Sequence, residues 1–263
     1  MSAICLPAAT LWKRELVRFA RDRNRMFGAI LQPVILWFLV GYGLDASFLP
    51  AGYPESMRYL EYIYPGTLLL ILLFTAIFST ITVVEDRKEG FMQSVLVAPV
   101  SRMGLVLGKI LGGTTLALLE GIVFLVFLFW LNIEVSPIAL ASTVGFLALI
   151  SFALTGLGFT IAWRMESTAG FHAIMNVFLM PMWLLSGSFF PPTGVPSWLG
   201  WVMTLNPLTY GMAGLRQVLY LETGLEGAGL PGMGLCVGIT ALFAVLTLGT
   251  SVLVVRRRDG GRI

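Results

Sequence analysis

Charged residues are scarce in this chain of 263 residues, because Asp, Glu, Lys and Arg together make up only 12% of it. Soluble globular domains carry about 25% charged residues, so an ordinary water-soluble fold is excluded. Hydrophobic residues instead account for 57% of the sequence, which is more apolar surface than one water-facing domain of this size could bury. Lipid must therefore be the solvent for most of the chain.

Cysteine and histidine are almost absent. Cys5 and Cys236 lie at opposite ends of the sequence, and His172 is the single histidine. Two distant cysteines do not make a disulfide framework, and a histidine without a second ligand at a suitable spacing does not make a metal site. No serine or threonine lies in a nucleophile motif. We therefore expect no metal, no cofactor and no catalytic residue.

A nucleotide-binding motif is also missing. The nearest approach to a phosphate-binding loop runs from Gly104 through Gly108 and Lys109 to Ile110. It has three residues between its glycines where the motif requires four, and Ile110 stands where Ser or Thr would bind the metal. Gly108 and Gly112 instead form a pair of small residues four apart, a spacing that allows two helices to approach closely.

Long apolar runs are abundant, and a helix needs about 20 such residues to cross the hydrocarbon core of a membrane. The sequence predicts an all-α, polytopic membrane protein with six transmembrane helices, at residues 26–44, 62–84, 104–131, 138–163, 170–188 and 233–255. An even number of spans places both termini on the same side.

Basic residues are unevenly distributed between the two sides of this arrangement. Of the 17 Lys and Arg residues, 15 lie on the side of the termini and the 85–109 loop, and only Arg58 and Arg216 lie opposite. Positively charged loops stay in the cytoplasm, so we expect a multi-pass protein of the cell (inner) membrane with both termini cytoplasmic. Basic blocks beside apolar runs are typical of membrane topology, and we expect no nucleic-acid partner.

Residues 1–25 precede the first span and have two unlike faces. Trp12, Leu16 and Phe19 recur at helical spacing on one face. Arginines recur on nearly the opposite face, at Arg14, Arg18, Arg21 and Arg25. This pattern predicts an amphipathic interfacial helix, separate from a six-helix transmembrane domain over residues 26–263. Such a helix can lie on anionic membrane lipid or also contact a cytosolic partner, and both interpretations stay open.

The 85–103 loop follows the second span and combines charge with apolar residues. It opens with the run Glu85, Asp86, Arg87, Lys88, Glu89 and Gly90. A short helix is predicted after it, ending at Pro99, with Phe91, Val95 and Leu96 on one face. An apolar ridge ringed by charge suits docking, and the alternative is a solvated charged loop.

The connection before the last span is long and rich in aromatic residues and prolines. It predicts two short helices that form a re-entrant hairpin over residues 189–220, dipping into the outer leaflet. The residues of this external hairpin include Pro191, Pro192, Pro196, Trp198, Asn206, Pro207, Tyr210 and Arg216. An ordinary loop with scattered aromatics is the alternative.

One acidic residue falls inside a predicted span. Glu120 follows Leu118 and Leu119 and precedes Ile122 and Val123 in the third apolar run. A carboxyl group within a membrane marks either an interhelical hydrogen bond or a pathway for substrate or protons. We favour the structural hydrogen bond and keep the substrate or proton role open.

Three passages together resemble a known family. They are the run from Glu85 to Gly90 with Leu96, Pro99 and Lys109 behind it; the six spans after an amphipathic helix; and Asn206-Pro207-Leu208-Thr209-Tyr210 followed by Leu215-Arg216. Over nearly its whole length the chain resembles the permease subunit of type-two ABC exporters, a group that includes daunorubicin-resistance, nodulation and polysaccharide exporters.

The resemblance implies a half-transporter that pairs with a second permease, usually a copy of itself, and with two separate ATPase subunits. ATP hydrolysis would then belong to another chain, in agreement with the missing nucleotide motif, and the permease itself would not be an enzyme. In the family, the interfacial helix and the loop after the second span contact the ATPases. The coupling contacts implied here are Glu85, Asp86, Arg87, Glu89, Gly90 and Pro99, with Arg14, Arg18 and Arg21 as secondary candidates.

Two other functions compete with an exporter permease. A secondary transporter or channel would need coupling-ion residues within the spans, and Glu120 is the candidate for that role. A membrane assembly factor without transport activity is the third interpretation. Apolar and aromatic spans suit a drug, a lipid-linked molecule or a glycan alike as the substrate.

Overall fold

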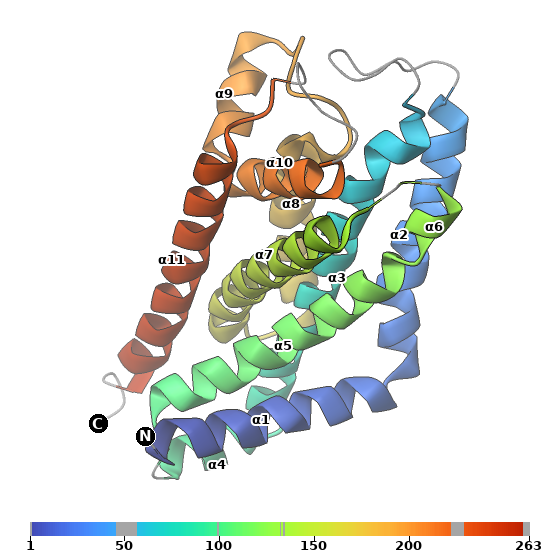
Figure 1. Cartoon of the computed structure of the whole chain (residues 1–263). Coiled ribbons are helices and arrows are strands. Elements are labelled where there is room, and N and C mark those ends of the chain that lie inside the picture. The colour runs from blue at the N-terminus through green and yellow to red at the C-terminus, as the bar shows by residue number, and fades with distance from the viewer. Residues whose placement is uncertain are drawn as a thin grey trace.

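The computed structural model describes residues 2–45, 57–98, 100–131, 133, 135–221 and 229–259, and these form helices and connections without a strand. Six helical segments in this part of the chain are long and apolar enough to cross a membrane (Figure 1). The predicted all-α, six-span fold is therefore confirmed. The helices are α1 (Ser2–Arg21), α2 (Arg23–Leu44), α3 (Tyr59–Lys88), α4 (Phe91–Val97), α5 (Arg102–Phe124), α6 (Phe127–Trp130), α7 (Pro137–Arg164), α8 (Thr168–Trp183), the π-helical turn η1 (Leu184–Ser188), α9 (Ser197–Leu205), α10 (Pro207–Leu219) and α11 (Met233–Asp259).

Local sequence signals explain where several helices begin. The side chains of Ser101, Ser136 and Ser167 each accept a hydrogen bond from the backbone N–H three residues on, at the starts of α5, α7 and α8. Serine is among the preferred residues at this capping position, because its oxygen satisfies an N–H group that the helix cannot. Pro137 and Pro207 occupy the first turns of α7 and α10, where a missing N–H costs nothing.

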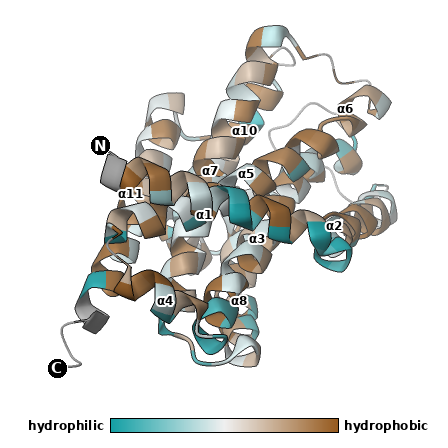
Figure 2. Ribbon diagram, turned by 90° about the horizontal axis from the view of Figure 1, so that it is seen from below, coloured by the Kyte–Doolittle hydropathy of each residue, from teal (hydrophilic) through white to brown (hydrophobic). Residues whose placement is uncertain are grey.

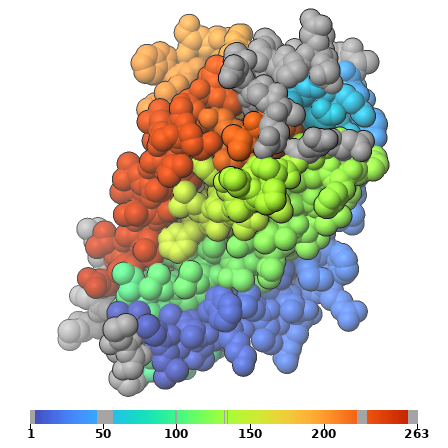
Figure 3. All heavy atoms as spheres, viewed as in Figure 1, coloured from blue at the N-terminus to red at the C-terminus, as the bar shows by residue number. Residues whose placement is uncertain are grey.

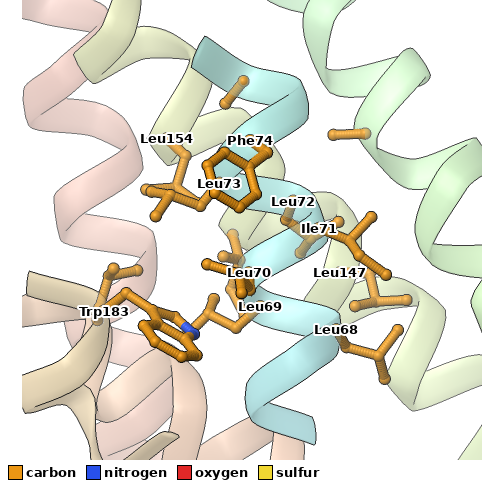
Figure 4. Close-up of a cluster of buried hydrophobic side chains, with 14 of the residues drawn as sticks. Leu68, Leu69, Leu70, Ile71, Leu72, Leu73, Phe74, Leu147, Leu154 and Trp183 are labelled. Carbon is orange, nitrogen blue, oxygen red and sulfur yellow. The ribbon is translucent and has the colours of Figure 1, made fainter. Parts of the chain in front are cut away.

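Helix α3 forms the centre of the molecule. Its six consecutive residues Leu68–Leu73 are all buried, so the helix has no lipid-facing side at this level. Leu147 and Leu154 of α7 and Trp183 of α8 pack around it (Figure 4). A helix that is apolar on all sides is typical of a buried position, and here the burial is provided by a single chain.

Helix α1 lies along the first half of α5 (Figures 1 and 3). A Cβ atom added to Gly108 would meet Leu11 Cβ at 2.7 Å and Ala8 O at 2.8 Å, and one added to Gly112 would meet Glu15 Cβ at 2.7 Å. The close approach indicated by the spacing of these two glycines is thus made with α1, and it requires residues without a side chain.

The face that α1 turns toward the protein differs from the predicted apolar face. The buried line consists of Ala8, Leu11, Glu15 and Phe19, whereas Trp12 is partly exposed and donates from Nε1 to Thr115 Oγ1 at 3.0 Å. An acid therefore occupies a buried position between two apolar residues. The helix ends at Arg21, and α2 begins at Arg23 with Asp22 as its N-cap.

Two short helices, α9 and α10, occupy the predicted hairpin segment. The Asn206 side chain joins them to α8, because its Nδ2 donates to Met182 O at 2.6 Å and its Oδ1 accepts from Leu208 N at 3.0 Å. The Arg216 side chain is buried and donates to Tyr62 O at 3.1 Å and Gly187 O at 3.2 Å. Gly187 has a φ of 83°, which a glycine adopts without strain.

The start of α1, the end of α11 and the short helix α4 all lie at one end of the bundle (Figure 1). Hydrophilic residues gather at this end over α1, the start of α2 and the region of α4 and α8 (Figure 2). Helices α9 and α10 lie toward the opposite end (Figure 1). The two predicted functional regions are therefore separated by the length of the bundle.

Candidate functional site

The charged end of the bundle contains a connected set of ion pairs, which we call the charge network. It joins four helices through four basic and four acidic side chains, whose formal charges cancel. Its members are Arg14, Glu15 and Arg18 of α1, Asp22 and Arg25 at the start of α2, Glu85 and Asp86 of α3, and Lys109 of α5.

Asp86 is the centre of this network, and its side chain is 0% exposed. Arg14 binds both of its carboxylate oxygens, with Nη2–Oδ1 and Nη1–Oδ2 distances of 2.7 and 2.9 Å. Arg18 Nη1 donates to Asp86 Oδ1 at 2.7 Å, and Lys109 Nζ donates to the other oxygen. Bidentate arginine–carboxylate pairs are among the strong charge-assisted hydrogen bonds, and hydrogen bonding to Asp86 raises the pKa of the Arg14 guanidinium.

Lys109 is buried between two acids that come from different helices. Besides Asp86, its Nζ contacts Glu15 Oε1 at 2.7 Å, and the lysine and Glu15 side chains are each 3% exposed. Thr82 of α3 donates to Glu15 Oε2 at 2.9 Å. A buried charge is tolerated only when it is paired and hydrogen-bonded, so α1, α3 and α5 depend on one another at this point.

Glu85 completes the network at its rim. Its carboxylate accepts from Arg18 Nη2 at 2.8 Å and from Arg25 Nη2 at 2.5 Å. Glu85 and Asp86 lie in the last turn of α3, where the helix dipole disfavours negative charge. The arginines of α1 and α2 offset this effect, which explains why acids can end this helix.

The remaining members of the charged run have other positions. Arg87 Nη1 donates to the carbonyl groups of Trp163 and Met165, at 3.2 Å for Met165, and so caps the end of α7. Gly90 has a φ of 79° and makes the turn from α3 into α4. Glu89 is exposed, and Pro99 lies outside the described residues.

The predicted short helix is present as α4, but its apolar ridge faces inward. Phe91, Val95 and Leu96 pack against the core, and the Arg14 guanidinium lies 3.9 Å from the centroid of the Phe91 ring. Packing against α1 and the neighbouring helices removes these apolar side chains from water. The exposed face of α4 consists instead of Gln93, Ser94 and Val97, and Val97 is 88% exposed.

An open groove of about 620 Å³ runs along the outer side of α1. Basic side chains dominate its lining, which consists of Thr10, Lys13, Arg14, Val17, Arg18, Arg21 and Glu89. The structure thus brings the predicted residues Arg14, Arg18, Arg21 and Glu89 to one surface. This surface offers hydrogen-bond donors and positive charge beside the exposed face of α4.

Glu15, Asp22, Arg25 and Lys109 belong to the network although sequence reasoning did not single them out as site residues. Glu15 could have been found from the sequence, because it is the acid that falls on the same face of α1 as Ala8, Leu11 and Phe19. Among the described residues, no group of three or more His, Cys, Asp or Glu side chains could hold a metal ion.

Comparisons with known proteins show the family of the chain. The ABC-2 type transporter family model matches residues 8–220. Nodulation protein J of Sinorhizobium fredii is 24% identical over 253 residues, covering 94% of this chain and 92% of the relative. The daunorubicin resistance ABC transporter permease protein DrrB1 of Streptomyces coeruleorubidus is 22% identical over 261 residues, covering 94% and 86%.

A bacterial permease of similar length also matches. The inner membrane transport permease YadH of Escherichia coli K12 is 25% identical over 213 residues, covering 79% of this chain and 80% of the relative. The family match includes α1 from Ala8 onward, the charge network and the helices as far as α10. This chain belongs to the ABC-2 type transporter family and is a multi-pass membrane permease subunit.

Proposed function

We propose that this permease forms the substrate pathway of an ATP-driven exporter, as a dimer with a second copy of itself and with two separate ABC ATPase subunits. The family match and the relatives named as ABC or transport permeases support this assignment. The observation that carries it is the charge network, which fastens α1 to the ends of the two spans that α4 connects.

The ATPase-docking surface of this proposal consists of the exposed face of α4 and the basic side of α1. Its residues are Lys13, Arg21, Glu89, Gln93, Ser94 and Val97. The excess of positive charge favours an acidic partner surface. Asp86 is fully buried and Glu85 is paired with two arginines. These acids therefore lie beneath the docking surface and hold α1 in place.

Movement of α4 acts on two spans at once, because the chain enters it from α3 and leaves it into α5. Arg14 stacks on Phe91 and binds Asp86, so α1 follows the same movement. We infer that closure of the ATPase pair displaces α4 and α1 together. The displaced ends of α3 and α5 then change access between the two permease copies.

Two polar side chains on exposed surfaces of the spans are an argument for a second permease copy. Gln32 of α2 and Asn176 of α8 are exposed in the isolated chain, although both lie within candidate spans. Polar groups facing hydrocarbon are costly, and they usually face a protein interior or a water-filled cavity. A second copy placed against these helices would remove that cost and enclose a pathway.

The proposed orientation places α1, α4 and both termini in the cytoplasm and residues 189–220 at the outer side of the cell membrane. The split of basic residues supports it. Trp198 and Trp201 of α9 are 68% and 70% exposed, and tryptophan favours the membrane interface. We place α9 and α10 as a hairpin in the outer leaflet.

A charge placed on the exposed face of α4 tests the docking surface. Val97→Asp should abolish co-purification of the partner ATPase and stop export, while the permease still inserts normally, because an apolar contact would be replaced by a buried charge. Thr193→Asp, at an exposed position near the other end, is the matched control and should behave as wild type. Normal ATPase binding by the Val97→Asp permease would refute docking at α4.

A further inference from the structure

Glu120 lies eleven residues beyond Lys109 on α5 and contacts α3 through Thr75. The carboxyl oxygen Oε2 of Glu120 is hydrogen-bonded to Thr75 Oγ1. Both residues are buried, and the second carboxyl oxygen, Oε1, has no hydrogen-bond partner in the described part of the chain. The proposed transport function does not use this carboxyl group.

The hydrogen-bond geometry at Thr75 limits the protonation state of Glu120. Thr75 Oγ1 also lies 2.8 Å from Ile71 O, which can only accept a hydrogen bond. A hydroxyl group has one hydrogen to donate and two lone pairs with which to accept. An ionised Glu120 would have to share the one threonine hydrogen with Ile71 O. Glu15 shares the hydrogen of Thr82 with Ser79 O in this way, but it is paired with Lys109, whereas no cation pairs with Glu120 among the described residues. A protonated Glu120 donates to Thr75 and leaves the threonine hydrogen for Ile71.

The charged groups on the surrounding helices are too distant to stabilise a carboxylate here. Helices α3 and α7 pack against this part of α5, and their nearest charged side chains are Asp86 and Arg164, at their ends. Asp86 follows Thr75 by eleven residues, or about 16 Å at 1.5 Å per residue. Lys109 is as far from Glu120 along α5 and already binds Glu15 and Asp86.

The other two helices that pack on α5 also carry their charges elsewhere. Helix α1 lies beside the first half of α5, and its charged residues are Lys13, Arg14, Glu15, Arg18 and Arg21. Arg256 lies near the end of α11. No ion pair among the described residues includes Glu120, and an unpaired carboxylate at a buried position is strongly disfavoured.

We propose that Glu120 is a neutral carboxylic acid that donates a hydrogen bond to Thr75 Oγ1 and positions α3 against α5. It is then an uncharged cross-link within the span, and the charge network is an ionic cross-link of the same two helices at their cytoplasmic ends. Thr75, Ser79, Thr82 and Asp86 follow one another at spacings of four, three and four on the side of α3 that meets α5.

The role assigned to this link rests on the proposed function, but the protonation state does not. Two cross-links at different depths hold α3 and α5 together as a unit, so that a displacement at α4 moves both spans together. Because Glu120 stays neutral, it offers no negative charge to a cationic substrate or a metal cation.

Infrared spectroscopy of the assembled transporter in lipid nanodiscs tests the protonation state directly. The wild-type minus Glu120→Gln difference spectrum at neutral pH should contain the C=O stretch of a protonated carboxylic acid, shifted in D₂O and by ¹³C-labelling of glutamate. A carboxylate band in its place would overturn the proposal, whether or not the complex exports a substrate.

A double-mutant cycle tests the cross-link. Glu120→Gln should keep wild-type amounts of assembled complex because the amide can still donate to Thr75, whereas Glu120→Leu and Thr75→Val should each lower the thermal midpoint. Their effects should be clearly less than additive in the double variant. Thr114→Val is the matched control, because the one hydrogen bond of the Thr114 hydroxyl to a described residue lies within its own helix, to Ile110 O at 2.7 Å. Additive effects, or an unstable Gln variant, would overturn the positioning role.

Discussion

At the scale of single residues, the charge network depends on Lys109 more than on any arginine. The arginines are partly exposed and can exchange a carboxylate for water, whereas Lys109 is enclosed with Glu15 and Asp86. Surface ion pairs contribute little to stability, but removing one partner of a buried pair leaves a buried charge without compensation. The lysine therefore determines whether α1 stays on α3 and α5.

We expect Lys109→Met to destabilise the permease by about 3–5 kcal/mol, because Glu15 and Asp86 would lose their shared cation. A lower thermal midpoint of the purified permease and less assembled complex in the membrane would be the measured effects. Lys88→Met removes the same charge from an exposed position and should change neither quantity. Equal behaviour of the two variants would contradict the assigned importance of Lys109.

Sequence reasoning identified several of these residues but not their partners. The family resemblance implies ATPase contacts at Arg14, Arg18, Glu85 and Asp86, and the structure shows that each also forms ion pairs within the chain. The reason is that helical periodicity orders residues around one helix and does not indicate which helix packs beside it. The pairing of Glu15 with Lys109 requires the contact of α1 with α5, which no local pattern encodes.

At the scale of elements, the close packing of α1 on α5 is a specific interface. Gly108 lets the α1 backbone approach to within contact of α5, since the carbonyl oxygen of Ala8 occupies the space a side chain would need. In the proposed mechanism this interface carries movement between the docking surface and the spans. Its disruption should affect coupling more than membrane insertion.

Gly108→Val should displace α1 and lower ATPase binding by at least tenfold, because its side chain would overlap with Ala8 and Leu11. The permease should still insert into the membrane in near wild-type amounts, since valine keeps α5 apolar. Gly145→Val is the control, as a Cβ at Gly145 of α7 meets nothing within 4 Å. ATPase affinity measured by titration on the purified permease distinguishes them, and an unaffected Gly108→Val permease would exclude this role for α1.

The elements themselves were largely predictable. Apolar runs of sufficient length predicted each span, and Pro207 after Asn206 predicted the break between α9 and α10. The direction of a short helix was less predictable. The ridge of Phe91, Val95 and Leu96 was expected to dock a partner or to belong to a solvated loop. It packs against the core instead, and Arg14 lies over Phe91.

At the scale of the whole molecule, the proposed orientation makes opposite predictions for the two ends. In a permease lacking Cys5 and Cys236, a single cysteine at Thr193 should react with an impermeant thiol reagent in intact cells. A single cysteine at Lys88 should react only after the cells are opened. Both positions are exposed, so a difference in labelling reports the side of the membrane, and the reverse pattern would invert the topology.

The enclosure of α3 also has a consequence for how the protein is made. This helix is synthesised second among the spans, but α5, α7, α8 and α10, which cover it, leave the ribosome later. A newly inserted α3 therefore meets lipid on sides that are later covered by protein. The finished packing depends on lipid molecules leaving as each later helix arrives, and the exchange is driven by close packing and hydrogen bonds instead of the hydrophobic effect. During biogenesis of this permease, the lipid around α3 is thus replaced step by step by the helices that are made after it.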